Sequence, residues 1–280
     1  MTHAASTPVP ADLLAPVARH IGEALVALDF DGTLAPIVRD PTTSRPVDGT
    51  PAVLSDLAAR GARLALITGR EAEVVLQLSG LAELPDLIVD GVYGAQQWRA
   101  GELTVLPTPP GMQAARAEVD DVLRDAGADP AVWVEDKQVS FVVHTRLADD
   151  PDAAFSAVED AVADLAGRHG LELHPGKQVL EVRVPGIDKG GALGRLLDDL
   201  DPAALVWAGD DLGDVPAFER LQAWRAETGR PALGVAVRPG TSPDPLANAD
   251  DDVHPTLAAL ADVVVDGPEQ VLEVLRALAG

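Results

Sequence analysis

Short apolar segments that end in small or acidic residues constrain the fold of this chain more than any other feature. Residues 24–30 read ALVALDF and lead into DGT, and residues 204–208 read ALVWA and lead into GDD. Similar segments occupy residues 63–67, 86–89, 233–237 and 262–265. Nearly continuous apolar character over so few residues is typical of strands that are buried on both faces of a parallel sheet.

Stretches with the apolar spacing of helices separate these strands. They cover residues 51–60, 71–78, 189–200, 215–227 and 268–278. Alternation of strand and helix predicts an α/β fold with a doubly wound parallel sheet. Ligands bind such sheets beyond the carboxyl ends of the strands, which is where the acidic residues of this sequence fall.

The middle of the chain breaks the alternation. After a proline cluster at residues 107–110, we predict a helix over 113–125, strands over 132–135 and 139–145, a helix over 151–169, and strands over 171–174 and 179–184 with a Pro175-Gly176 turn between them. This αββαββ order predicts an inserted α+β domain over residues 108–184. The core then comprises residues 21–107 and 185–280, preceded by a flexible segment over residues 1–20.

Composition excludes several classes of function. The net charge is −24, which repels phosphate backbones and anionic membranes, so we expect neither nucleic acid nor a membrane as a partner. The sequence has no cysteine, which excludes disulfides and zinc–thiolate sites. It shows no apolar run of about 18 residues and no signal peptide, so we expect a cytoplasmic protein.

Asp29 and Asp31 follow the first core strand. Two acids at this spacing on extended chain point to the same side, so one can act as a nucleophile and the other as an acid/base, with a cation between them. The alternative is a plain turn, because Asp and Gly favour turns. An EF-hand loop is excluded because its sixth position would be Leu34, where glycine is required.

Two further motifs offer groups that bind anions. Thr68-Gly69-Arg70 follows the second strand, where a hydroxyl and free amides at a helix N-terminus can hold a phosphate, although a simple helix cap explains Thr68 equally well. Lys189 begins a helix, a position that the helix dipole disfavours for a cation. A nearby phosphate would explain it, and a solvated surface lysine is the alternative.

Three acids follow the strand at residues 204–208, namely Asp210, Asp211 and Asp214. Two charges about 4 Å apart repel by roughly 1 kcal/mol in water and roughly 4 kcal/mol at a surface-like dielectric constant. A hard cation with oxygen ligands would relieve this repulsion, and Mg²⁺ fits that description best.

Taken in order, the motifs DFDGT, TGR, Lys189 and GDDLGD resemble those of the haloacid-dehalogenase (HAD) superfamily of phosphatases. Two segments of the insertion, WVEDKQVSFVVHTR (133–146) and GKQVLEVR (176–183), resemble the trehalose-6-phosphate phosphatase family. The resemblance extends from about residue 22 to the C-terminus. It implies a HAD-like doubly wound core with an inserted α+β cap domain.

The resemblance also implies roles for individual residues. Asp29 would be the nucleophile and Asp31 the acid/base, while Thr68 and Lys189 would hold the phosphate. The Mg²⁺ site would comprise Asp29, the main-chain carbonyl of Asp31, and Asp210, with Asp214 supporting it. The substrate-binding candidates are Thr68, Gly69, Arg70, Gly91, Glu135, Lys137, His144, Lys177, Glu181 and Arg183.

Each cap candidate has a simpler alternative. Glu135 and Lys137 can pair across a hairpin, His144 can be a satisfied strand histidine, and Lys177 can be a solvated turn residue. The chain also departs from the family pattern, because Gly213 and Val215 stand where Thr and Glu are usual, and Val184 displaces the usual proline to Pro185.

We therefore predict a Mg²⁺-dependent phosphatase that hydrolyses trehalose 6-phosphate through an aspartyl-phosphate, in trehalose biosynthesis. The alternatives are a HAD phosphatase for sucrose phosphate, mannosyl-phosphoglycerate or a trehalose-like aminocyclitol phosphate, a phosphosugar mutase, and a non-catalytic sugar-phosphate binder. We expect a monomer, with any trehalose-6-phosphate synthase partner a separate chain.

Overall fold

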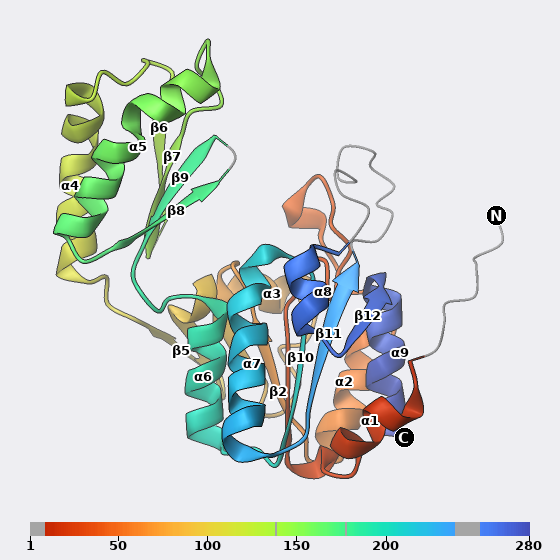
Figure 1. Cartoon of the computed structure of the whole chain (residues 1–280). Helices are drawn as coiled ribbons and strands as arrows, with labels where there is room; N and C mark the ends of the chain where they lie inside the picture. Colours follow the sequence, from red (N-terminus) through yellow and green to blue (C-terminus); the bar gives the residue numbers. More distant parts are fainter. Residues whose placement is uncertain (1–8, 138, 177, 239–252) are drawn as a thin grey trace, which may run out of the picture. The chain divides into compact units, whose positions relative to one another are not determined.

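The structure is a computed structural model that describes residues 9–137, 139–176, 178–238 and 253–280. It divides into two compact units, shown in Figure 1. The core unit comprises residues 1–104 and 188–280, and the cap unit comprises residues 105–187. Lys177, one of the substrate-binding candidates, lies outside the described residues.

The core unit is built on an eight-stranded sheet in the order β12-β11-β10-β1-β2-β3-β4-β5. Its strands are β1 (Ala24–Leu28), β2 (Arg63–Ile67), β3 (Ile88–Gly91), β4 (Gln96–Arg99), β5 (Glu102–Val105), β10 (Ala204–Gly209), β11 (Ala232–Arg238) and β12 (Val263–Asp266). The pairs from β12 to β3 are parallel, and β4 runs antiparallel to β3. All residues of β1 and β10 are buried, as expected for central strands covered on both faces.

Helices cover both faces of the core sheet (Figure 1). One face packs against α1 (Ala11–Ala18), α2 (Thr50–Ala59), α3 (Ala72–Ser79) and α9 (Gly267–Ala279). The other packs against α6 (Lys189–Leu200), α7 (Val215–Thr228) and α8 (Pro255–Leu260). The 3₁₀ helices are η1 (Ile21–Glu23), η2 (Pro41–Thr43), η3 (Val92–Gly94) and η4 (Leu212–Asp214).

The cap unit has the predicted αββαββ order. Its elements are α4 (Pro110–Asp125), β6 (Trp133–Asp136), β7 (Ser140–His144), α5 (Pro151–Arg168), β8 (Glu172–Gly176) and β9 (Val179–Arg183). The strands form an antiparallel sheet in the order β6-β7-β9-β8. Phe141, Val143, Leu180 and Val182 pack against α4 and α5 on one face. The alternate residues of the same strands therefore form the opposite face, which we call the open face.

The fold differs from the sequence prediction in four places. Residues 11–18 form α1 with Val17 fully buried, so the flexible segment predicted over residues 1–20 is wrong there. The predicted Pro175-Gly176 turn is also wrong, because both residues lie within β8, an edge strand that tolerates proline. Strands β4 and β5 and helix α8 were not predicted. No helix among the described residues is long and apolar enough to cross a membrane.

Candidate active site

The chain reverses its direction of winding between β1 and β10, since β1 pairs with β10 on one side and with β2 on the other. Sheets of this kind bind ligands where the strand order reverses, beyond the carboxyl ends of the strands. Asp29 follows β1 there and Asp210 follows β10. The main-chain N–H of Asp29 donates to the carbonyl of Ala208 at 3.0 Å, so the two strand ends are held together up to the acids.

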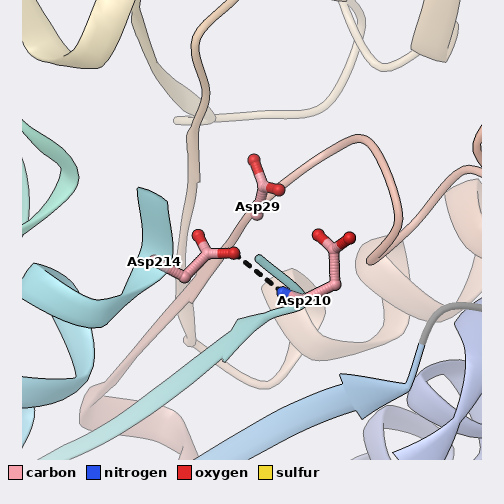
Figure 2. Close-up of side chains that lie close together, drawn as sticks. All are labelled: Asp29, Asp210 and Asp214. Atoms are coloured by element: carbon pink, nitrogen blue, oxygen red, sulfur yellow. Dashed lines mark hydrogen bonds between the residues drawn. The ribbon is translucent and has the colours of Figure 1, made fainter. Parts of the chain in front are cut away.

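Asp29, Asp210 and Asp214 lie close together beyond the strand ends (Figure 2). One oxygen from each lies within 4.8 Å of the others, and the three side chains are buried. The expected cluster of acids at the strand ends is therefore present, with Asp214 supplied by the turn before α7. Its oxygen donors are those that a hard divalent cation prefers.

Lys189 lies within this cluster and is buried, so it is not the solvated surface lysine considered as the alternative. Its Nζ lies 3.0 Å from Oδ1 of Asp29 and 2.6 Å from Oδ1 of Asp214. It is the first residue of α6, whose N-terminus is capped by Asp188 through a 2.7 Å bond from the N–H of Gly191. One ammonium thus lies within 3.0 Å of two of the three buried acids, and full ionisation of all three would leave the cluster with excess negative charge.

Burial and mutual repulsion make the acids of this cluster hard to ionise. Burial raises the pKa of Asp29 to about 8, although the Lys189 ammonium opposes this shift. Burial and the neighbouring Asp29 carboxylate hold the pKa of Asp210 well above its ordinary value. Burial alone would lower the pKa of Lys189, but Asp29 and Asp214 outweigh it and raise that pKa well above the ordinary value. A cation would therefore stabilise the ionised acids.

Asp214 organises the loop that carries Asp210. Its Oδ2 accepts from the N–H of Asp210 at 2.8 Å and from the N–H of Asp211 at 3.0 Å, while its Oδ1 accepts from Lys189. Asp211 faces outward and caps η4 by accepting from the N–H of Gly213 at 2.9 Å. The side chain of Asp214 is thus engaged by protein groups, whereas Asp210 accepts at 3.5 Å from Thr33.

Glycines permit this close packing. A Cβ on Gly32 would lie 2.0 Å from an oxygen of Asp210, and the φ of Gly32 is +77°. A Cβ on Gly209 would lie 2.3 Å from the carboxyl carbon of Asp214. Both positions therefore require glycine.

Asp31 lies in a different environment from Asp29. The Arg70 guanidinium grips its carboxylate, with Nε at 2.5 Å from Oδ2 and Nη2 at 2.7 Å from Oδ1. The buried hydroxyl of Ser44 donates to the same Oδ1 at 3.0 Å. Arg70 also donates to the carbonyl of Pro41 at 2.8 Å. Arg70, a substrate-binding candidate, thus binds the acid/base candidate, and Ser44 joins them without any sequence signal that could have identified it.

The Thr68-Gly69-Arg70 loop is hydrogen-bonded to the segment after β3. The N–H of Thr68 donates to the carbonyl of Asp90 at 3.0 Å, and the N–H of Tyr93 donates to the carbonyl of Thr68 at 2.9 Å. A Cβ on Gly91 would lie 2.4 Å from the amide nitrogen of Ala72, and one on Gly69 would lie 2.8 Å from the Tyr93 hydroxyl oxygen. Thr68 is buried, and its hydroxyl accepts from the N–H of Arg70 at 3.2 Å. Its own O–H can then donate to an anion at the strand end.

The described cap candidates are grouped on the open face, mostly in pairs. Nε2 of His144 lies 2.9 Å from Oε2 of Glu135, so Glu135 pairs with His144. Glu181 accepts from Arg183 at 2.5 Å and from the Ser140 hydroxyl at 3.0 Å. Burial alone would raise the pKa of Glu181, but these contacts with Arg183 outweigh it and lower that pKa. Lys137 follows β6, is exposed, and contributes to this lowering.

A hollow of about 440 Å³ lies elsewhere in the core unit. It is lined by Arg45, Asp48, Glu269 and Arg276, among others, and includes no residue of the acid cluster. The candidate active site is therefore identified by its buried charges rather than by cavity size.

Comparisons with known proteins show the family to which this chain belongs. A family model described as trehalose-phosphatase matches residues 27–250. A trehalose-phosphate phosphatase from Mycolicibacterium paratuberculosis is 33% identical over 271 residues, covering 91% of this chain and 61% of that protein. The chain therefore spans less than two thirds of this curated relative.

Solved structures share the fold. That of Aspergillus fumigatus trehalose-6-phosphate phosphatase aligns with a TM-score of 0.75 at 22% identity, covering 98% of both chains. A haloacid dehalogenase-like hydrolase from Bacteroides thetaiotaomicron aligns with a TM-score of 0.63 at 14% identity, covering 90% of this chain and 98% of that one. The predicted HAD-like α/β fold with an inserted α+β domain is thereby confirmed.

Proposed function

Because this chain belongs to the trehalose-phosphatase family, we propose that it hydrolyses trehalose 6-phosphate to trehalose and inorganic phosphate. The observation that carries this proposal is the buried cluster of Asp29, Asp210, Asp214 and Lys189 beyond β1 and β10. Acids that serve only as surface charges stay exposed, because burying a charged group costs free energy. A site that binds a phosphoryl group and a cation benefits from burial, because electrostatic interactions are stronger away from water.

Asp29 is the proposed nucleophile. Lys189 holds its Oδ1, so Oδ2 attacks the phosphorus atom. The bond from phosphorus to the sugar oxygen breaks as the bond to Oδ2 forms, which gives an aspartyl-phosphate and releases the sugar alcohol. Thr68 and Lys189 bind the phosphoryl oxygens, and both lie at the same edge of the sheet as Asp29.

Asp31 is the proposed acid/base. In the first step the Asp31 carboxyl group is protonated, with one oxygen released from Arg70, and it gives that proton to the departing sugar oxygen. Its carboxylate then takes a proton from the water that attacks the aspartyl-phosphate. Phosphate leaves and Asp29 is regenerated. Arg70 and Ser44 fix the orientation of the Asp31 carboxylate and are the proposed positioning residues for both proton transfers.

Mg²⁺ is the proposed cofactor. The donors fit it, because Asp210 is buried with a single long hydrogen bond from Thr33 among the described residues, and its pKa is raised by burial and by Asp29. Asp29, Asp210 and the main-chain carbonyl of Asp31 would hold the ion, and Asp214 would keep Asp210 in place. When bound, Mg²⁺ supplies positive charge that offsets the repulsion between the Asp29 carboxylate and the phosphate dianion.

The open face of the cap is the proposed source of substrate selection. Glu135, Lys137, Glu181 and Arg183 offer the donors and acceptors that sugar hydroxyls require, and His144 stays on that face beside Glu135. Gly69 and Gly91 contribute close backbone approach beside the phosphate, and Lys177 is proposed with them on the sequence alone.

Phosphate release tests this function. The purified protein is incubated with trehalose 6-phosphate, sucrose 6-phosphate, mannosyl-phosphoglycerate and glucose 6-phosphate, with Mg²⁺ and with EDTA. We expect Mg²⁺-dependent release that is fastest with trehalose 6-phosphate. Faster release from another member of the panel would keep the chemistry and reject the substrate, and phosphate return to sugar without release would indicate a mutase.

A further inference from the structure

The tryptophans of this chain are not equivalent in exposure. Of the four, Trp207 and Trp224 are buried at 0% and 4% exposure, and Trp98 is half-buried against the core. Trp133, the first residue of β6 in the cap unit, is 42% exposed. Aromatic residues make up 3% of the chain, so an indole left in contact with water on the cap is unusual for this sequence.

Trp133 does not lie loosely on the surface. Its ring stacks on the imidazole of His144, with centroids 4.1 Å apart and an angle of 8° between the planes. The two residues are directly opposed on neighbouring strands, since Trp133 pairs with His144 in the β6–β7 register. One face of the indole is therefore covered by His144, and its exposed area comes from the other face and the edges.

Glu135 fixes the imidazole in turn. Its Oε2 lies 2.9 Å from Nε2 of His144, while Nδ1 of the same ring is buried and has no hydrogen-bond partner among the described residues. Neither ring nitrogen of His144 is thus open to a sugar hydroxyl in this arrangement. The pair of Glu135 and His144 instead sets the indole in one plane, which lowers the entropy cost of binding a ligand on it.

The surroundings of Trp133 indicate what that plane binds. Glu135 lies two residues along β6 on the same open face, and Glu181, Ser140 and Arg183 follow farther along β7 and β9, joined by hydrogen bonds. A flat apolar surface on the same face as a row of hydrogen-bonding groups matches a pyranose ring, which has C–H groups on its faces and hydroxyls at its edge. A role for Trp133 in packing alone would explain the stack on His144. It would not explain why the second face of the indole stays exposed on an edge strand, where exposed apolar surface favours aggregation.

We propose that Trp133 is a specificity-determining residue that stacks against a glucose ring of the substrate, with His144 and Glu135 as the residues that position it. This inference rests on the proposed function, because it takes a sugar phosphate as the ligand. It assigns to Trp133 the sugar contact that the sequence motif suggested for His144.

Kinetics with two substrates test the proposal. Trp133→Leu removes the ring and Trp133→Phe keeps a smaller one, while Leu147→Ala removes exposed apolar surface elsewhere on the cap unit as the matched control. We expect KM for trehalose 6-phosphate to rise roughly tenfold in Trp133→Leu and roughly threefold in Trp133→Phe, with kcat little changed. Hydrolysis of p-nitrophenyl phosphate, which has no sugar ring, stays at the wild-type level in all three variants.

Fluorescence supplies a readout that does not depend on turnover. Trp133 is the most exposed indole of the four, so stacking of a sugar on it changes the emission of the Asp29→Asn protein, which binds substrate without turnover. Trehalose 6-phosphate and trehalose should change the emission, inorganic phosphate should not, and Trp133→Phe in the same background should remove the change.

The results separate this proposal from the proposed function. Where the wild type is active, three results would overturn the role of Trp133 alone: an unchanged KM for trehalose 6-phosphate in Trp133→Leu, a parallel loss with p-nitrophenyl phosphate, or an unresponsive emission of the Asp29→Asn protein. A wild type without activity on trehalose 6-phosphate would overturn the proposed function and this inference with it.

Discussion

The carboxyl edge of the core sheet and the open face of the cap sheet both gather charged residues, but they treat charge in opposite ways. At the core edge, Asp29, Asp210, Asp214 and Lys189 are each at most 6% exposed, and carboxylates outnumber the one ammonium. On the open face, Glu135 is paired with His144 and Glu181 with Arg183, with partial exposure to water. The core edge gathers buried acids that a cation and a phosphate would engage, and the open face offers partly exposed pairs whose hydrogen bonds sugar hydroxyls can replace.

This difference predicts that the chemistry depends on the core edge far more than on the cap. Asp29→Asn removes the nucleophile without changing the shape of the side chain, so turnover of trehalose 6-phosphate should fall at least roughly a thousandfold. Phosphate release under saturating substrate measures it. Asp56→Asn, an exposed acid on α2, is the matched control and should turn over like the wild type. Near-wild-type turnover in a folded Asp29→Asn protein would exclude Asp29 as the nucleophile.

The two regions should also differ in stability. Lys189→Met leaves buried Asp29 and Asp214 without their ammonium and should lower the free energy of unfolding by about 3–5 kcal/mol. Arg183→Met leaves Glu181 partly hydrated and should cost about 1 kcal/mol. Urea unfolding followed by circular dichroism measures both. Equal losses in the two variants would mean that burial does not distinguish the core cluster from the cap pairs.

The positioning of Asp31 makes a finer prediction within the core. Arg70→Met frees the carboxylate from its bidentate contact, so proton transfer to a sugar alcohol should slow by roughly 100-fold in kcat/KM. p-Nitrophenol departs without needing a proton, so p-nitrophenyl phosphate should lose much less. Ser44→Ala removes one hydrogen bond to Asp31. Its kcat/KM should also fall more with trehalose 6-phosphate than with p-nitrophenyl phosphate, but by less than in Arg70→Met. A loss of equal size on both substrates would assign Arg70 to phosphate binding instead.

Asp90 tests whether ionising a buried acid outside the cluster, at the same edge of the sheet, lowers the stability of the protein. Burial raises the pKa of Asp90 to about 6, although the hydrogen bond from Gln97 opposes this shift. Within the part of the chain that the structure describes, Oδ2 of Asp90 has no hydrogen-bond partner. The folded protein thus holds a proton between pH 4 and 6 that the unfolded chain has released, so stability falls as pH rises through this window. Asp90→Asn should remove about 1–3 kcal/mol of that fall.

Thermal unfolding of the wild type and Asp90→Asn across pH 4 to 8 measures the effect. The two curves should diverge from about pH 4 and run parallel above about pH 6, with Asp90→Asn the more stable. A constant difference across the whole range would mean that Asp90 titrates at its ordinary value.

The parts that the sequence predicts well are those with a local signal. The segments over β1 and β10 are apolar because both faces of these strands are buried. Asp29 and Asp210 follow the ends of these strands, and the pairing of β1 with β10 brings the two acids together. Lys189 also has a local signal, because a cation at the start of a helix is unfavourable without a negative partner. The sequence suggests a phosphate as that partner, and the structure adds the carboxyl groups of Asp29 and Asp214.

The missed features depend on contacts between distant residues. Asp31 accepts hydrogen bonds from Ser44 and Arg70 because two loops that are distant in sequence meet there. A serine among prolines and threonines carries no local signal for such a contact. The stack of Trp133 on His144 depends on strand register. Strands β4 and β5 are half-buried and exposed, so they lack the apolar runs that identify the central strands.

The central claim is that Asp29 carries the phosphoryl group. The most direct test is to mix the enzyme with trehalose 6-phosphate and Mg²⁺, quench it in acid during turnover, and reduce it with borohydride, which converts a phosphorylated aspartate into homoserine. Mass spectrometry of the digested protein should find homoserine at position 29 and unmodified aspartate at positions 31, 210 and 214. Turnover with position 29 unmodified, or with homoserine at another position, would contradict the mechanism.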